Sequence, residues 1–324
     1  MMTKDKKSII WIVIIATLFS GYFVADFFLS DEIAPRAIHE NDFQGNYFAM
    51  GTIEKKAAVI LIGGGQWGDY WAQEIAKKDY VGFSLPFIRR EGLPDLPEEI
   101  NLEYFEKALI WLKNQKEVDP RKIIVMGASR NAELSLVLAS VFPDHISGVI
   151  AYAPSSVSWS NTVLPYNSDE LKPSWKYSGA DIPYIPMDKI VGNETNKLET
   201  LEYWENGLAK IKDYPNAVIK VENINGPILL LSGIDDEVWP SAMMANMIEK
   251  RLIDHDFKFP FQNIQYENAG HLVSTHPNIS SGIRTGKLKV NNKEYDFDFG
   301  GTDEGDQKAK LDAQEKIFKF IDDL

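Results

Sequence analysis

The sequence predicts an α/β fold built on a doubly wound, mostly parallel β-sheet. Short apolar runs rich in β-branched residues alternate along the chain with segments that have the apolar spacing of helices. The runs lack the polar alternation of half-exposed strands, which is typical of strands buried on both faces of a parallel sheet. A chain of 324 residues, 44% of them hydrophobic, is long enough for one such domain.

Each expected strand leads into a turn or a helix, as a doubly wound sheet requires. The expected strands cover residues 57–65, 80–87, 122–129, 147–154, 226–233 and 263–271. The expected helices cover residues 98–115, 131–142, a segment that begins near Pro240, and 303–324. In the first of these helices Leu102, Phe105, Leu109 and Leu112 share one face. We therefore expect a single domain over residues 57–324.

One segment, residues 155–223, interrupts this alternation and is rich in Pro, Trp, Tyr, Ser and Asn. A loop of that length without structure of its own is uncommon in a compact domain. We expect an inserted, lid-like segment, partly helical around 196–211, over the carboxyl ends of the strands, where such sheets bind ligands. Its aromatic residues are candidates either for lining a substrate site or for packing the insertion onto the body: Trp159, Trp175, Tyr177 and Tyr184.

The N-terminus differs from the rest of the chain. Three lysines precede an uncharged apolar run over residues 8–24, which predicts an uncleaved signal anchor in residues 1–30. A cleaved signal peptide and a buried helix are the alternatives. Lysines on this flank favour a cytoplasmic N-terminus, so we expect a membrane-anchored protein with its catalytic domain on the periplasmic or extracytoplasmic side. Residues 31–56 are expected to form a linker.

Composition excludes several classes of function. The formal net charge of −13 argues against nucleic-acid binding, which needs clustered Lys and Arg. The chain has no cysteine, so disulfides, thiolate metal sites and a Cys nucleophile are excluded. The glycine-rich turn at 63–65 has neither the ending of a phosphate loop nor the spacing of a dinucleotide loop. We expect no cofactor and no metal.

The stretch "VMGASRNAE" places Ser129 between an expected strand and an expected helix. A nucleophile elbow needs this context, because the sharp turn exposes the serine hydroxyl at the top of the sheet. Gly127 supplies the first glycine of the Gly-x-Ser-x-Gly pattern, but Asn131 replaces the second and would have to point away from the strand. The alternative is that Ser129 only caps the helix that follows.

An acid and a base follow in the order that such a nucleophile requires. Asp236 comes directly after an expected strand, with Asp235 as the alternative acid, and His271 follows a glycine at the end of another strand. His276 is a nearby rival for the base. We expect Ser129, Asp236 and His271 to form a catalytic triad.

Backbone amides are expected to stabilise the oxyanion. The turn in "LIGGGQWGDYW" follows the first expected strand, which points to the amides of Gly65 and Gln66, together with that of Arg130. The tryptophans near these segments are candidate substrate contacts: Trp67, Trp159 and Trp239.

These residues, with the stretches around them, resemble a known family. The stretches "GGGQWGDYWAQEIAKKDYVGFSL", "GASRNAELSLVLAS", "GPILLLSGIDDEVWPSAMMA" and "YENAGHL" are similar to the C-terminal catalytic domain of bile-acid-CoA:amino acid N-acyltransferases and acyl-CoA thioester hydrolases. The resemblance implies an α/β-hydrolase fold related to dienelactone hydrolases. It also supports Asp236 and His271 as partners of Ser129, and serine at that position matches the hydrolase type.

We therefore expect a serine hydrolase of the acyl-CoA thioesterase type, acting on a small-molecule acyl ester or thioester. The alternatives are an exported carboxylesterase, lactonase or peptidase-like hydrolase, an acyltransferase, and a non-catalytic domain that keeps the fold. Esters and thioesters share the acyl-enzyme step, so the motifs do not separate these substrates.

Overall fold

The computed structural model describes residues 33–40, 42–51, 54–161, 170–279, 282–290 and 292–324. Residues 35–324 form one compact unit. The expected signal anchor, residues 1–30, lies outside the described residues. Within the described ranges, no helix combines the length and the apolar character that crossing a bilayer requires.

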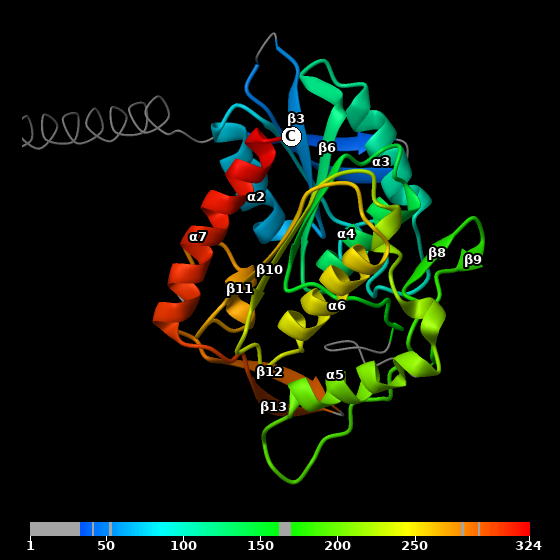
Figure 1. The fold of residues 1–324 in the computed structure, drawn as a ribbon, viewed down its shortest axis with the longest axis vertical. Coiled ribbons are helices and arrows are strands. Elements are labelled where there is room, and N and C mark those ends of the chain that lie inside the picture. Colours follow the sequence, from blue (N-terminus) through cyan, green and yellow to red (C-terminus); the bar gives the residue numbers. More distant parts are fainter. Residues whose placement is uncertain (1–32, 41, 52–53, 162–169, 280–281, 291) are drawn as a thin grey trace, which may run out of the picture. The chain divides into compact units, whose positions relative to one another are not determined.

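An eight-stranded sheet forms the centre of the unit, in the order β1-β2-β4-β3-β6-β7-β10-β11 (Figure 1). Only β2 runs antiparallel to its neighbours, and every other adjacent pair is parallel. The strands are β1 (Arg36–Glu40), β2 (Phe43–Phe48), β3 (Lys56–Ile62), β4 (Val81–Leu85), β6 (Val118–Ala128), β7 (Gly148–Tyr152), β10 (Ile228–Gly233) and β11 (Phe261–Tyr266). The predicted mostly parallel sheet is confirmed.

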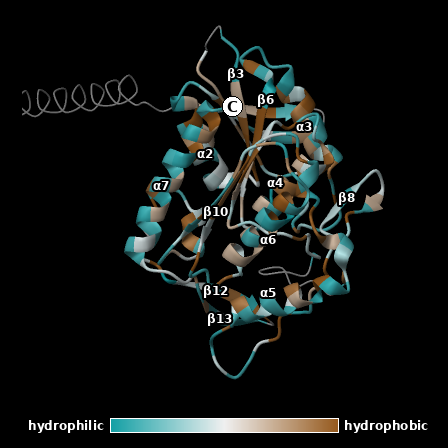
Figure 2. Cartoon of the chain, in the orientation of Figure 1, coloured by the Kyte–Doolittle hydropathy of each residue, from teal (hydrophilic) through white to brown (hydrophobic). Residues whose placement is uncertain are grey.

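Helices cover both faces of this sheet. On one face lie α2 (Gly65–Lys77) and α7 (Asp303–Asp322), and on the other lie α3 (Glu103–Lys113), α4 (Arg130–Val141) and α6 (Ser241–Asp254) (Figure 1). The apolar residues gather on the central strands and on the helix faces turned toward them (Figure 2). Burial of these strands on both sides explains their continuous apolar sequences.

The expectation of a linker over residues 31–56 is wrong, because β1 and β2 lie in this region and extend the sheet. The rings of Phe43 and Tyr47 pack edge-to-face on Trp111, at centroid distances of 5.7 and 5.6 Å. Since both rings are buried in the main core, the domain begins near residue 35 and not at 57.

The insertion is partly helical, as predicted, with α5 (Thr200–Leu208) inside the expected helical stretch. It also contains β8 (Trp175–Tyr177) and β9 (Ala180–Asp181), which form a small sheet with β5 (Ile100–Asn101). The hairpin of β12 (Thr285–Val290) and β13 (Lys293–Asp298), which precedes α7, was not predicted from the sequence.

Candidate active site

Ser129 occupies a sharp turn between β6 and α4. Its backbone has φ 57° and ψ −122°, a strained conformation for a residue with a side chain. Ser129 stands at the cap position of α4, but its side chain accepts no capping hydrogen bond. The geometry therefore favours the nucleophile elbow over the helix cap.

Glycine is required at Gly127 because β6 and α4 pass closely there. A Cβ at Gly127 would lie 2.2 Å from the carbonyl oxygen of Asn131. The side chain of Asn131 turns away from β6 and lies against the glycine turn, so that a Cβ at Gly63 would meet Asn131 Nδ2 at 2.2 Å. Asn131 thus fills space between the elbow and the turn expected to supply oxyanion donors.

The expected acid and base are in direct contact. His271 Nδ1 lies 2.9 Å from Asp236 Oδ2, and the side chain of Asp236 is only 2% exposed. The same carboxylate accepts hydrogen bonds from Ser241 Oγ at 2.7 Å and from the backbone amides of Val238 and Trp239. Asp235, the alternative acid, is exposed. An ionised carboxylate only accepts hydrogen bonds, so Nδ1 carries a hydrogen and Nε2 is left as the basic nitrogen.

Sheet topology brings the three residues to one edge. Ser129 follows β6, Asp236 follows β10, and His271 follows β11, and these strands with β7 between them are all parallel. Carboxyl ends of parallel strands meet at the same edge, which is where open α/β sheets bind ligands.

His271 begins a short 3-10 turn, η4 (His271–Ser274), that is held by hydrogen bonds to several other segments. Its amide donates to Phe299 O at 2.8 Å, and Trp67 Nε1 donates to Ser274 O at 2.8 Å. The buried carboxylate of Asp306 accepts from the amide of Gly270 at 2.8 Å and pairs with Arg284 at 2.6 Å.

His276, the rival base, lies in another environment. Its ring stacks on Tyr70 with centroids 3.9 Å apart. Its Nδ1 is buried and has no hydrogen-bond partner among the described residues. Burial, followed by the charge of Lys310, lowers the pKa of His276. Because no carboxylate of the described residues bonds to its Nδ1, His276 does not match the geometry of a triad base.

The glycine turn after β3 has a conformation suited to oxyanion donors. Gly63, Gly64 and Gly65 all have positive φ, of 96°, 55° and 66°. Gly65 and Gln66 are the first residues of α2, and Arg130 is the first residue of α4. Amides in the first turn of a helix have no intrahelical acceptor and carry the positive end of the helix dipole.

Of the three tryptophans expected to contact substrate, Trp67 is half-buried beside η4. Trp159 and Trp239 are 0% and 1% exposed and belong to one apolar cluster with Trp204. A fully buried side chain lines no open site, so the substrate contacts expected for Trp159 and Trp239 are wrong, and for Trp159 the packing alternative holds. Trp175 is likewise buried, at 1% exposed.

Sequence reasoning missed Glu133, which lies one turn after Ser129 in α4. Its side chain is fully buried and pairs with Arg130. Burial raises the pKa of Glu133, and the guanidinium of Arg130 opposes this effect. The signal was present in "NAELSLVLA", where Glu133 is the single charged residue of a mostly apolar stretch.

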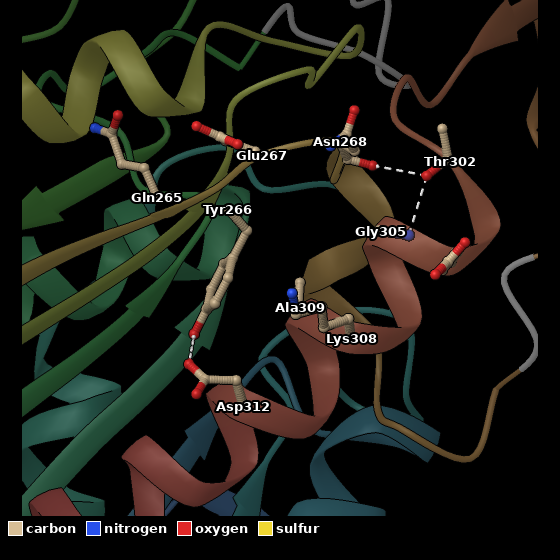
Figure 3. Close-up of a pocket in the computed structure, with 10 residues that line it drawn as sticks. Gln265, Tyr266, Glu267, Asn268, Thr302, Gly305, Lys308, Ala309 and Asp312 are labelled. Carbon is tan, nitrogen blue, oxygen red and sulfur yellow. Dashed lines mark hydrogen bonds between the residues drawn. The ribbon is translucent and has the colours of Figure 1, made fainter.

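A separate cavity of about 640 Å³ lies between β11 and α7 and includes none of the expected site residues (Figure 3). Some of its polar groups are bonded to one another: Tyr266 Oη lies 2.9 Å from Asp312 Oδ2, and Thr302 Oγ1 bonds to Asn268 O and Gly305 N. Across the described ranges, no cluster of three or more His, Asp or Glu side chains is arranged to hold a metal ion.

Comparison with known proteins places the chain in a family. The family model described as "BAAT / Acyl-CoA thioester hydrolase C terminal" matches residues 100–323. Acyl-coenzyme A thioesterase 6 of Mus musculus is 26% identical over 255 residues, covering 78% of this chain and 56% of that protein. Mitochondrial acyl-coenzyme A thioesterase 2 of Rattus norvegicus is 29% identical over 264 residues, covering 80% and 53%. The chain thus spans about half the length of these relatives.

Among solved structures, the carboxylesterase Cest-2923 from Lactobacillus plantarum aligns with 90% of this chain and 98% of its own. The TM-score is 0.52 and the sequence identity is 12%. This likeness concerns the fold alone, and it confirms the expected α/β-hydrolase architecture.

Proposed function

Because the chain belongs to the BAAT / acyl-CoA thioester hydrolase C-terminal family, we propose that it is a serine hydrolase of the acyl-CoA thioesterase type. The observation that carries the proposal is the contact between His271 Nδ1 and the buried Asp236 carboxylate. With the strained elbow at Ser129, it supports a catalytic triad on one edge of the sheet.

In the proposed mechanism, Ser129 Oγ attacks the acyl carbonyl carbon while His271 Nε2 takes its proton. Asp236 stabilises the imidazolium and holds the ring through Nδ1. Collapse of the tetrahedral intermediate breaks the bond to the leaving thiolate or alkoxide, which receives the proton from His271. A water molecule then gives a proton to Nε2 and attacks the acyl-enzyme. Collapse of this second intermediate breaks the bond to Ser129 Oγ, which takes the proton back from Nε2 as the acid leaves.

The amides of Gly65, Gln66 and Arg130 are the proposed oxyanion donors. Support comes from their positions at the starts of α2 and α4 and from the contact of Asn131 with the Gly63 turn, which keeps the two helix starts together. Loss of one such donor costs on the order of 2.7–4 kcal/mol of transition-state stabilisation.

The proposed substrate is an acyl-CoA thioester, because the relatives described above are acyl-coenzyme A thioesterases. Carboxylic esters, lactones and peptide-like substrates are the alternatives, and so is acyl transfer to an amine or alcohol. Hydrolysis of acyl-CoAs with a range of chain lengths should be compared with that of p-nitrophenyl esters, using the chain and its Ser129→Ala variant. We expect turnover that the variant lacks. A folded wild-type chain that turns over neither class would contradict the proposal.

We also propose that residues 1–30 anchor the chain in a membrane, with the hydrolase domain on the extracytoplasmic side. The apolar run after three lysines supports this arrangement. Protease added to spheroplasts should digest the domain, whereas protection until lysis would reverse the proposed topology.

A further inference from the structure

The insertion is bound to α4, the helix that follows Ser129, through one buried carboxylate. Glu133 accepts hydrogen bonds from the backbone amide of Trp159 at 3.2 Å and from Trp175 Nε1 at 2.8 Å. Its partner Arg130 donates to Ser174 Oγ at 2.6 Å, and its guanidinium lies over the Trp175 ring. Two parts of the insertion that are distant in sequence therefore bind the first turn of α4.

These contacts argue against an insertion that swings open. A buried carboxylate is stable only while charged or hydrogen-bonding partners surround it, and stripping those partners costs several kcal/mol. Movement of the insertion away from α4 would remove the Trp159 and Trp175 donors from Glu133. The described parts of the insertion that carry Trp159 and Trp175 thus form a fixed wall against α4.

Another part of the insertion contacts the loop of the proposed acid, and that loop in turn contacts the proposed base. In α5, which lies beyond the carboxyl ends of the strands (Figure 1), Thr200 Oγ1 donates to Glu237 O at 2.8 Å. The ring of Trp204 packs edge-to-face on Trp239 at 5.2 Å, and Trp239 packs edge-to-face on His271 at 6.2 Å.

A continuous path of buried groups joins these two ends. The ring of Trp159, whose amide binds Glu133, packs edge-to-face on Trp204 at 5.0 Å. The path thus leads from α4 through Trp159 and Trp204 to Trp239 and His271. Close-packed interiors transmit displacements because they contain little free volume.

We propose that the insertion is a scaffold that sets the position of Ser129 relative to Asp236 and His271, with Glu133 and Trp204 as its positioning residues. This inference rests on the proposed function, because it assumes that Ser129 is a nucleophile. Neither side chain touches reacting atoms: Glu133 acts through α4, and Trp204 acts through Trp239. A displacement of about 1 Å between reacting groups lowers a rate by about 100-fold.

The test is the second-order rate constant for labelling Ser129 with a fluorophosphonate probe, measured beside the melting temperature. Glu133→Gln keeps the shape and an acceptor but removes the charge that Arg130 requires. We expect it to lower the labelling rate about 10- to 100-fold, with kcat falling in parallel and KM changing little.

A matched pair of variants tests the other end, including the case in which Glu133→Gln does not fold. Trp204→Leu removes a ring from the path, while Trp111→Leu removes a buried ring that packs on Phe43 and Tyr47 at the opposite part of the sheet. Both should lower the melting temperature. Only Trp204→Leu should slow labelling, by about tenfold or more, whereas Trp111→Leu should label within about twofold of wild type.

Equal labelling rates for wild type, Glu133→Gln and Trp204→Leu would overturn the scaffold role and leave the insertion as packing only. Labelling that falls to the same extent in Trp111→Leu would also overturn it, because the effect would follow stability alone. Failure of the wild-type chain to label at all would instead count against the proposed function.

Discussion

The nucleophile side and the histidine side of the proposed site are each supported by a fully buried carboxylate, Glu133 and Asp306. Each lies in the first turn of a helix, where a negative charge is favoured, and each pairs with a half-buried arginine. Each also accepts a backbone amide from another segment, of Trp159 or of Gly270.

The two carboxylates differ in what they hold. Ser129 is placed by the sheet itself, since its amide donates to Tyr152 O of the neighbouring strand at 2.9 Å, and Glu133 holds the wall around it. His271 lies in a 3-10 turn outside the sheet, and Asp306 binds the residue directly before it. We infer that Asp306 positions the base directly through Gly270, whereas Glu133 adjusts the position of the nucleophile through α4, on a backbone that the sheet already holds.

The largest effect is expected from the groups that take part in the reaction. Ser129→Ala and His271→Gln should each lower kcat by about 10⁴- to 10⁶-fold, because these groups act as a unit. His276→Gln is the control, and its kcat in the same turnover assay should stay close to wild type. If His276→Gln were the inactive variant, the base would be misassigned.

Asp236→Asn is expected to come next, with a loss of about 10⁴-fold in kcat, because an amide favours the wrong imidazole tautomer. The neighbouring Asp235→Asn serves as its matched control, since Asp235 is exposed. Steady-state rates of the purified variants give the comparison, and equal losses in both would remove Asp236 from its proposed role.

Asp306→Asn tests whether the buried carboxylate of Asp306 holds the turn that carries His271. It should lower the free energy of unfolding by about 2 kcal/mol, because Arg284 loses its buried partner. Since Gly270 precedes His271, kcat should also fall, more than in Glu133→Gln. Denaturant unfolding and turnover measure the two effects. Asp303→Asn removes an exposed carboxylate 3.4 Å from Arg284 and should change neither quantity. A larger loss of kcat in Glu133→Gln than in Asp306→Asn would contradict the inferred difference between the two sides of the site.

Gly63→Ala should destabilise the nucleophile side by about 1–3 kcal/mol, because the residue has φ of 96° and its Cβ would meet Asn131. Combining it with Asn131→Gly removes that collision but not the backbone strain. A double-mutant cycle on unfolding free energy should therefore show favourable coupling, and simple additivity would mean that the two residues do not meet.

The smallest effect is expected from Asn131→Gly alone. Glycine is the residue that the elbow pattern prefers, so activity should be kept or raised. A large fall in kcat would show that the amide of Asn131 has a role beyond filling space against Gly63.

The central strands were predictable because burial on both faces leaves a continuous apolar sequence, as in Ile228–Gly233. The edge strand β1 was missed because only Ile38 of its residues is buried. The hairpin of β12 and β13 was missed for a similar reason: its few buried residues, Leu288, Val290 and Tyr295, are separated by charged ones.

For the site, Asp236 was expected because it follows an apolar run, and His271 because it follows a glycine at the end of an expected strand. Sequence alone did not distinguish an aromatic residue that lines a site from one that packs, so Trp159 was assigned to the wrong class. Glu133 was missed because its donors, Trp159 and Trp175, come from the insertion, whose path over α4 depends on tertiary packing.

Fluorophosphonate labelling of the wild-type chain, followed by mass spectrometry of the modified peptide, tests the central claim most directly. We expect a single adduct on Ser129 that is absent in Ser129→Ala and forms much more slowly in His271→Gln. An unlabelled wild-type chain, or labelling that persists in Ser129→Ala, would contradict it.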